Sequence, residues 1–234
     1  MALSTLAWPA SAQDNSAPLP PAADLLAKHL AAIGGRAAVD KFGSMTMTGA
    51  LRGGGVPVGA SFIRYADSQG RMVHELVVPD KPTEREGWNG HMAFRSTSGT
   101  DTPVTGTTAE GLRTRGEAFL GVHDVDVQKT AVTTERSDFM GCICYKVRLT
   151  LSFGATRFDY YDAKTGLLTG WIQPMPSLKD KPLERLVILR KYKAFGGVQV
   201  PTDIYDSEYD VDRRMLVADV KWNVPVPAAM KVTP

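Results

Sequence analysis

Histidine and carboxylate side chains are the residues of this sequence whose types could support acid–base chemistry. The candidates are His74 with Glu75, His91, Asp159 and Asp162. Neighbouring residues on a strand point to opposite faces of a sheet, so His74 and Glu75 cannot both line one cavity. Asp162 is better explained by a turn, where its carboxylate can accept backbone hydrogen bonds. An acid–base pair would therefore have to assemble from a histidine and a carboxylate that are distant in the sequence.

Other catalytic signatures are absent from the sequence. It contains no G-x-S-x-G, no H-E-x-x-H, no phosphate-binding loop and no dinucleotide fingerprint. We therefore expect no bound cofactor. A cofactor-free hydrolase, lyase or isomerase that uses a His–carboxylate pair is kept as an alternative function.

The two cysteines, Cys142 and Cys144, are separated by one residue. On a strand their thiols would face the same side, roughly 6.5 Å apart, which is too far for an unstrained disulfide. The spacing also differs from the C-x-x-C of redox and zinc sites. We interpret both cysteines as small buried hydrophobic residues. A strained redox pair and a soft-metal site are the alternatives, but no other residues indicate a metal-ligand set.

The composition is that of an ordinary globular domain. The chain has 234 residues, of which 43% are hydrophobic and 22% are charged, with a net charge of +2. Because no long basic block is present, a nucleic-acid partner has no electrostatic support. No stretch approaches the ~18 consecutive apolar residues of a membrane-spanning helix, so we expect a soluble protein.

The first residues differ in composition from the rest. Residues 1–12 are mostly small or apolar and end in Ala10-Ser11-Ala12, which resembles the cleavage end of a secretory signal peptide, although no basic residue precedes it. Residues 13–22 are rich in proline and small residues, and we expect a flexible leader there. Residues 23–234 are expected to form one domain, and the protein is expected to be exported.

The spacing of apolar residues predicts one helix followed mainly by strands. Asp24 could cap a helix in which Leu25, Leu26, Leu30 and Ile33 recur with the helical period. From residue 44 onward the apolar residues alternate with a period of two, and Gly-containing turns separate the alternating runs. A second helix is expected over residues 109–120, and the Pro-rich residues 173–182 read as one long loop. The fold class is therefore mainly β (α+β), an antiparallel meander.

Five segments occur in an order that is similar to one known group of proteins. They are the helix Ala23–Ile33 with Gly34-Gly35, the strand start Ser44–Gly49, the hairpin Trp88–Phe94, the turn Tyr161–Leu168, and the segment Phe195–Pro201. Over about residues 22–224 the chain resembles the LolA/LolB-like superfamily of periplasmic carriers, and in particular the outer membrane lipoprotein-sorting protein relatives. Each motif alone is a turn signature, so the resemblance depends on their order.

The resemblance implies a strongly curved antiparallel sheet, an unclosed β-barrel covered by an N-terminal helix and a central helix. It implies a bacterial periplasmic carrier that holds a lipid, a lipoprotein acyl chain or another hydrophobic molecule, with an envelope or membrane protein as partner. The central helix, with two glycines and a thin apolar stripe, would be a displaceable lid. The cavity or lid candidates are Met45, Met47, Phe62, Arg64, Met72, His74, Trp88, His91, Leu112 and Phe119.

The chain departs from the family pattern in two respects. Dedicated lipoprotein carriers place an arginine inside the cavity to bind the lid, and no arginine here can be matched to it. For Arg52, Arg64 and Arg71 the default orientation is toward solvent. No lipobox cysteine stands near the start, so we expect no lipid anchor. A scaffold subunit of an envelope complex, which would pair through exposed strand edges, is a third hypothesis.

Overall fold

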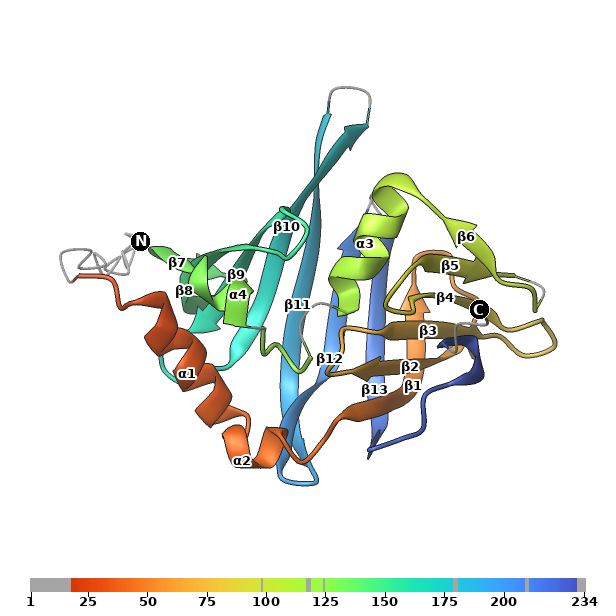
Figure 1. Ribbon diagram of the computed structural model, residues 1–234, viewed down its shortest axis with the longest axis horizontal. Helices are drawn as coiled ribbons and strands as arrows, with labels where there is room; N and C mark the ends of the chain where they lie inside the picture. The colour runs from red at the N-terminus through yellow and green to blue at the C-terminus, as the bar shows by residue number, and fades with distance from the viewer. Residues whose placement is uncertain are drawn as a thin grey trace, which may run out of the picture.

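The computed structural model describes residues 18–97, 99–116, 119–123, 125–178, 181–208 and 211–230 (Figure 1). These residues form one antiparallel sheet of thirteen strands. The strands are, in chain order, β1 (Ser44–Gly53), β2 (Ser61–Asp67), β3 (Met72–Val77), β4 (Glu84–Trp88), β5 (Ala93–Ser96), β6 (Thr102–Val104), β7 (Val132–Phe139), β8 (Cys142–Thr150), β9 (Thr156–Asp162), β10 (Leu168–Leu178), β11 (Lys181–Phe195), β12 (Val198–Glu208) and β13 (Val211–Trp222).

The sheet is open, with β6 and β7 at its two edges. Its spatial order is β6-β5-β4-β3-β2-β1-β13-β12-β11-β10-β9-β8-β7, so two meanders are joined where the first strand pairs with the last. We call β1–β6 the first limb and β7–β13 the second limb. Figure 1 shows the two limbs turned toward one another around a concave side. The predicted fold class, a mainly β protein with an unclosed barrel, is confirmed.

Four α-helices accompany the described strands: α1 (Ala22–Ala32), α2 (Arg36–Val39), α3 (Gly106–Gly116) and α4 (Val125–Lys129), followed near the end by the short 3₁₀ turn Ala228–Met230. Helix α3 lies over the limb formed by β3, β4 and β5, and α1 lies beside the other limb (Figure 1). No helix among the described residues is long and apolar enough to cross a membrane.

Three sequence-based boundaries were wrong. Helix α1 begins after Pro21 with no side-chain cap, so Asp24 lies within the first turn and does not cap it. The central helix ends at Gly116, and Leu120 has a left-handed backbone with φ 58°. The segment predicted as a loop over residues 173–182 is largely strand, because β10 and β11 pair as one long hairpin in which Pro174 lies opposite Glu184. A proline removes only its own N–H from such a ladder.

The main core lies on the concave side, where the first two helices meet the sheet. Leu25 and Ile33 pack there with Met45, Met47 and Leu168. A separate cluster, formed by Phe139, Cys144, Tyr160 and Ile188, lies apart from that core. Burial of this kind supplies most of the stability of both the sheet and the helices that it carries.

The two cysteines belong to that second cluster. Cys144 is buried, as predicted, and its thiol lies 3.5 Å from the Thr169 hydroxyl. Cys142 is only half-buried, and its thiol donates to an Asp162 carboxylate oxygen at 2.9 Å. Both thiols are free, and no group of three or more potential metal-binding side chains occurs among the described residues.

Candidate ligand-binding cavity

Strand pairing places a row of polar side chains on the concave face of the first limb. Arg64 on β2 lies opposite Met47 on β1 and opposite His74 on β3, and His74 lies opposite Glu86 on β4. Since paired residues of neighbouring strands point to the same face, all four side chains face inward together. Alternation along β2 then puts Phe62 and Ala66 on the same inner face.

A cavity of about 110 Å³ lies between this row and the second limb. Thr114 and Arg115 at the end of α3, with Leu120 and Gly121 just after it, cover the cavity. Apolar and thioether side chains from β1, β10, β11, β12 and β13 form much of the wall: Met45, Met47, Trp171, Val187, Ile204 and Met215. A smaller hollow of about 30 Å³ beside it is lined by Met72 and His74 and shares Arg64, Arg115 and Arg185 with it.

Arg115 attaches the end of α3 to both limbs of the sheet. Its Nη1 contacts Glu86 Oε1 on β4, and its Nη2 donates to Glu208 Oε2 on β12 at 2.6 Å. Glu86 also accepts from Arg95 at 2.8 Å. Burial alone would raise the pKa of Glu86, but Arg115 and Arg95 hold it at about 2. These contacts keep Glu86 ionised beneath the helix.

Arg64 is an inward-facing arginine that contacts the covering helix, contrary to the default solvent-facing orientation expected for it. Its Nη2 donates to the backbone oxygen of Arg115 at 3.0 Å, at the last turn of α3. Burial, together with the nearby Arg185 and Arg115, lowers the pKa of Arg64 to about 10. Its own burial, together with the nearby Arg64 and Arg115, lowers the pKa of His74 to about 4, so His74 is neutral at physiological pH.

Trp171 lines the cavity, and its ring contacts two arginines. The guanidinium groups of Arg157 and Arg185 each lie 5.1 Å from the centre of its ring. Arg185 also makes a paired contact with Asp206, with Nε 2.9 Å from Oδ1 and Nη2 2.5 Å from Oδ2. Cation–π contacts of this kind gain strength when water is excluded.

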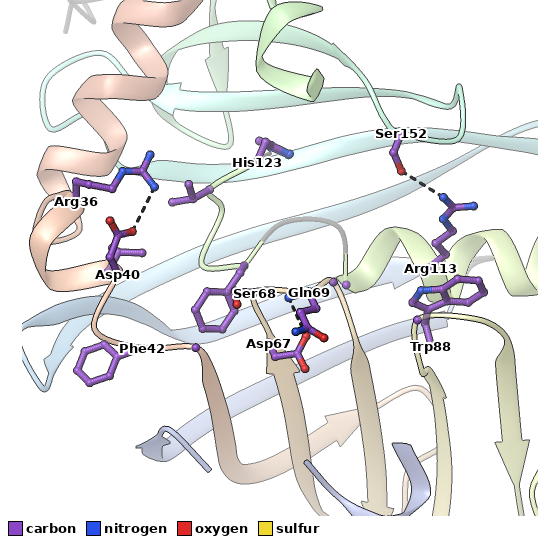
Figure 2. Close-up of a pocket in the computed structure, with 17 residues that line it drawn as sticks. Arg36, Asp40, Phe42, Asp67, Ser68, Gln69, Trp88, Arg113, His123 and Ser152 are labelled. Carbon is purple, nitrogen blue, oxygen red and sulfur yellow. Dashed lines mark hydrogen bonds and ion pairs between the residues drawn. The ribbon is translucent and has the colours of Figure 1, made fainter. Parts of the chain in front are cut away.

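Two further contacts of α3 involve Arg113, at the mouth between the limbs, and Leu112, on the inner side of the helix. Arg113 extends from α3 beside Trp88 (Figure 2), and its guanidinium lies 5.4 Å from the centre of the Trp88 ring. The centre of the Phe153 ring lies 5.1 Å from the same guanidinium. The opening there is a cleft of about 630 Å³ that Trp88, Phe119 and His123 help to line. Leu112, on the inner side of α3, is packed against Met72 and is almost fully buried.

One buried His–carboxylate pair does assemble from distant residues. His123 Nε2 lies 3.0 Å from Asp159 Oδ2, and Arg157 Nη2 lies 2.8 Å from the same ring nitrogen. Because a guanidinium can only donate, Nε2 cannot both accept from Arg157 and donate to Asp159. Arg157 and Tyr161 also donate to the carboxylate. This closed ion-pair network lacks the arrangement of a general base oriented by a carboxylate.

The ten candidates from the sequence are distributed unevenly around this interior. Met45, Met47 and Arg64 line the cavity, Met72 and His74 line the smaller hollow, Trp88 and Phe119 line the mouth, and Leu112 anchors α3. Phe62 is buried on the inner face and stacks on His74 with ring centres 5.9 Å apart. His91 is exposed in the β4–β5 turn, where its backbone N–H donates to Asn89 at 2.9 Å.

Several inward residues were missed by the sequence reasoning. They are Arg115, Arg157, Trp171, Arg185 and Asp206. Strand alternation could have grouped some of them, because Arg185 and Val187 on β11 share a face with Asp206 on β12. When a strand carries polar residues on both of its faces, the sequence around it does not show which face points inward.

Comparisons with known proteins identify the fold. No protein-family model matches the chain, and no curated protein matches it in sequence. LolA superfamily protein NE2245 from Nitrosomonas europaea is similar in structure, with a TM-score of 0.56 and 12% identity over 92% of this chain and 99% of that one. A DUF1329 family protein from Desulfovibrio piger gives a TM-score of 0.51 and 11% identity over 90% of this chain and 97% of that one. The chain therefore has the fold seen in the LolA superfamily.

Proposed function

We propose that this protein is a periplasmic carrier that holds a lipid, a lipoprotein acyl chain or another hydrophobic molecule on the concave side of its sheet. The observation that carries the proposal is the cavity beneath the end of α3, with apolar and thioether side chains from five strands in its wall. Methionine suits such a wall because its flexible side chain adapts to ligands of different shape. Each buried methylene of an acyl chain would contribute ~0.8 kcal/mol.

Loading would require α3 and the segment after it to move outward. A volume of about 110 Å³ is only a few times the ~30 Å³ that one water occupies in the liquid, so a long acyl chain does not fit the closed form. Leu112 is the large apolar side chain that α3 buries. The other attachments of α3 include the ion pair of Arg115, the hydrogen bond from Arg64 and the cation–π contacts of Arg113. Such attachments can be exchanged for water when the helix moves, which suits a lid.

The Arg64 contact gives the lid a defined closed position. This hydrogen bond joins a buried guanidinium on β2 to the backbone of α3. A ligand that entered beneath α3 would compete for the same guanidinium, so binding and lid opening would be coupled. Dedicated lipoprotein carriers hold the lid with a cavity arginine; the sequence alone gave no match for it, and we propose that Arg64 takes this role.

Export and a protein partner are further parts of the proposal. The Ala10-Ser11-Ala12 pattern lies outside the described residues, and it supports delivery to the periplasm. A carrier that takes up and releases a hydrophobic ligand needs a donor or an acceptor at a membrane, and we expect an envelope protein to be that partner. Residues 23–234 would act as a single domain.

Native mass spectrometry of the protein purified from its own cell envelope tests this function. A retained lipid or other hydrophobic molecule, identified after release, is the expected result. Met47→Trp fills the cavity and should abolish retention, whereas Ile63→Trp, an exposed position on the neighbouring strand, should not. A bare mass from both the wild type and the control would contradict the carrier function and favour a scaffold subunit.

A further inference from the structure

Three buried arginines around the cavity carry N–H groups that have no acceptor among the described residues. These groups are Arg64 Nε, Arg115 Nε and Arg185 Nη1. All three residues line both the cavity and the smaller hollow beside it. The Arg185 side chain is only 4% exposed. A buried donor without an acceptor costs free energy, and three in one place form an unusual concentration.

The three arginines also differ in whether a carboxylate balances their charge. Arg115 contacts Glu86 and Glu208, and Arg185 contacts Asp206. Arg64 has no carboxylate within salt-bridge distance among the described residues, and its Nη2 donates to the backbone oxygen of Arg115. An arginine side chain stays protonated, so its burial without a counter-charge is unfavourable unless an anion completes the site.

We propose that the cavity binds amphiphiles with one anionic head group, a carboxylate or a phosphate, and that Arg64, Arg115 and Arg185 bind that group. This inference rests on the proposed carrier function and names the ligand class for it. Guanidinium groups bind carboxylate and phosphate oxygens through short charge-assisted hydrogen bonds. The apolar tail would lie along the wall that includes Met45, Val187 and the other apolar residues described above.

The position of the arginines favours an amphiphile over a free anion. Arg64 and Met47 lie opposite one another on neighbouring strands, so the charged and apolar parts of the wall are contiguous. Thr114 and Arg115 of α3 also line the site. A small hydrated anion would lose its water there and gain no apolar contact, whereas a tail adds favourable burial along the wall.

Displacement of a neutral fluorescent probe, N-phenylnaphthylamine, from the full chain tests this assignment. Palmitate, hexadecyl phosphate and hexadecanol share one tail and differ in the head group. Each anionic ligand should displace the probe at about 10- to 100-fold lower concentration than hexadecanol, the ratio expected for hydrogen bonds to a charged group. Acetate and inorganic phosphate supply the head group alone and should displace little probe.

Arg64→Met should remove most of this preference, while Arg52→Met, at an exposed position on β1, should keep it. The melting temperature of unliganded Arg64→Met should be unchanged or raised, because the substitution removes a buried charge that lacks a carboxylate partner. A merely structural role for Arg64 would instead lower the melting temperature and leave the palmitate-to-hexadecanol ratio unchanged, which would overturn the inference.

The outcomes separate this inference from the proposed function. Equal displacement by palmitate and hexadecanol would overturn the anionic assignment and leave the carrier function intact. Failure of the probe and of all three long-chain ligands to bind would overturn both. Inorganic phosphate competing as well as hexadecyl phosphate would identify a free-anion site and refute the amphiphile. A preference for either palmitate or hexadecyl phosphate supports the inference and identifies the head group.

Discussion

The ionic attachment of α3 can be weakened by one isosteric substitution, Glu86→Gln. Glu86 contacts Arg115 at the end of α3 and Arg95 on β5, and its side chain is 17% exposed. The glutamine keeps the shape of the side chain and removes its charge. Glu110 lies exposed on α3 itself, so Glu110→Gln is the matched control.

The pKa of Glu86 sets the expected magnitude. Arg115 and Arg95 overcome the opposing effect of burial and hold this pKa at about 2, against a usual value of 4.5. At about 1.4 kcal/mol per pKa unit, the difference corresponds to roughly 3 kcal/mol. Because the folded-state pKa is the lower one, ionised Glu86 stabilises the folded protein above about pH 4.5, and this stabilisation is lost as the pH falls toward 2.

Hydrogen exchange and urea unfolding together measure this effect. At neutral pH Glu86→Gln should lose up to roughly 3 kcal/mol of unfolding free energy, or expose the α3 amides to exchange up to about 100-fold faster if the helix opens locally. The difference from wild type should shrink between about pH 4.5 and pH 2. If Glu86→Gln and Glu110→Gln behaved alike in both measurements, the ionic attachment of α3 would be refuted.

Three further predictions concern packing, reactivity and the buried ion pairs. Gly116→Ala should speed the hydrogen exchange of the α3 amides, because a Cβ there would lie 2.1 Å from a backbone oxygen of the β2–β3 turn. Gly111→Ala should slow this exchange, because its Cβ would lie 3.7 Å from the nearest neighbouring atom. The reverse order of exchange rates would contradict the packing. Burial and a hydrogen bond to a carboxylate raise the pKa of Cys142 to about 12, so iodoacetamide should alkylate this thiol slowly at about pH 8. Rapid labelling would contradict the raised pKa. Asp159→Asn leaves Arg157 buried without a carboxylate and should lower the free energy of unfolding in urea by about 3–5 kcal/mol. The exposed control Asp219→Asn should lower it little. Equal losses would argue against the stabilising role of the Arg157–Asp159 ion pair.

Local signals in the sequence predicted the turns and most of the strands. Asn89 accepts from the backbone of the β4–β5 turn, and Gly166 adopts φ 77° in the turn before β10. These features depend on a few neighbouring residues, so they can be read without the fold. The segment over residues 173–182 misled the prediction because its prolines suggest a break, whereas pairing with β11 extends β10.

The short range of these signals also explains where the candidate site residues lie in the structure. Met45, Met47 and Arg64 were named as cavity or lid candidates with the family resemblance, and all three line the cavity. His91, in the hairpin that begins at Trp88, was a candidate too, yet its turn places it in solvent, outside the cavity. Alternation groups residues by face, but it does not show which face is concave.

The sequence by itself determined that this protein is a mainly β chain with an N-terminal helix and a second helix between strands, because strand period, helix period and turn residues act over short distances. Only the tertiary structure decided that Arg64, Arg115 and Arg185 meet around one cavity. They come from β2, α3 and β11, and the curvature of the sheet and the pairing of β1 with β13 bring these elements together. Contacts between residues so far apart in the chain depend on the whole packed fold, which no local pattern contains.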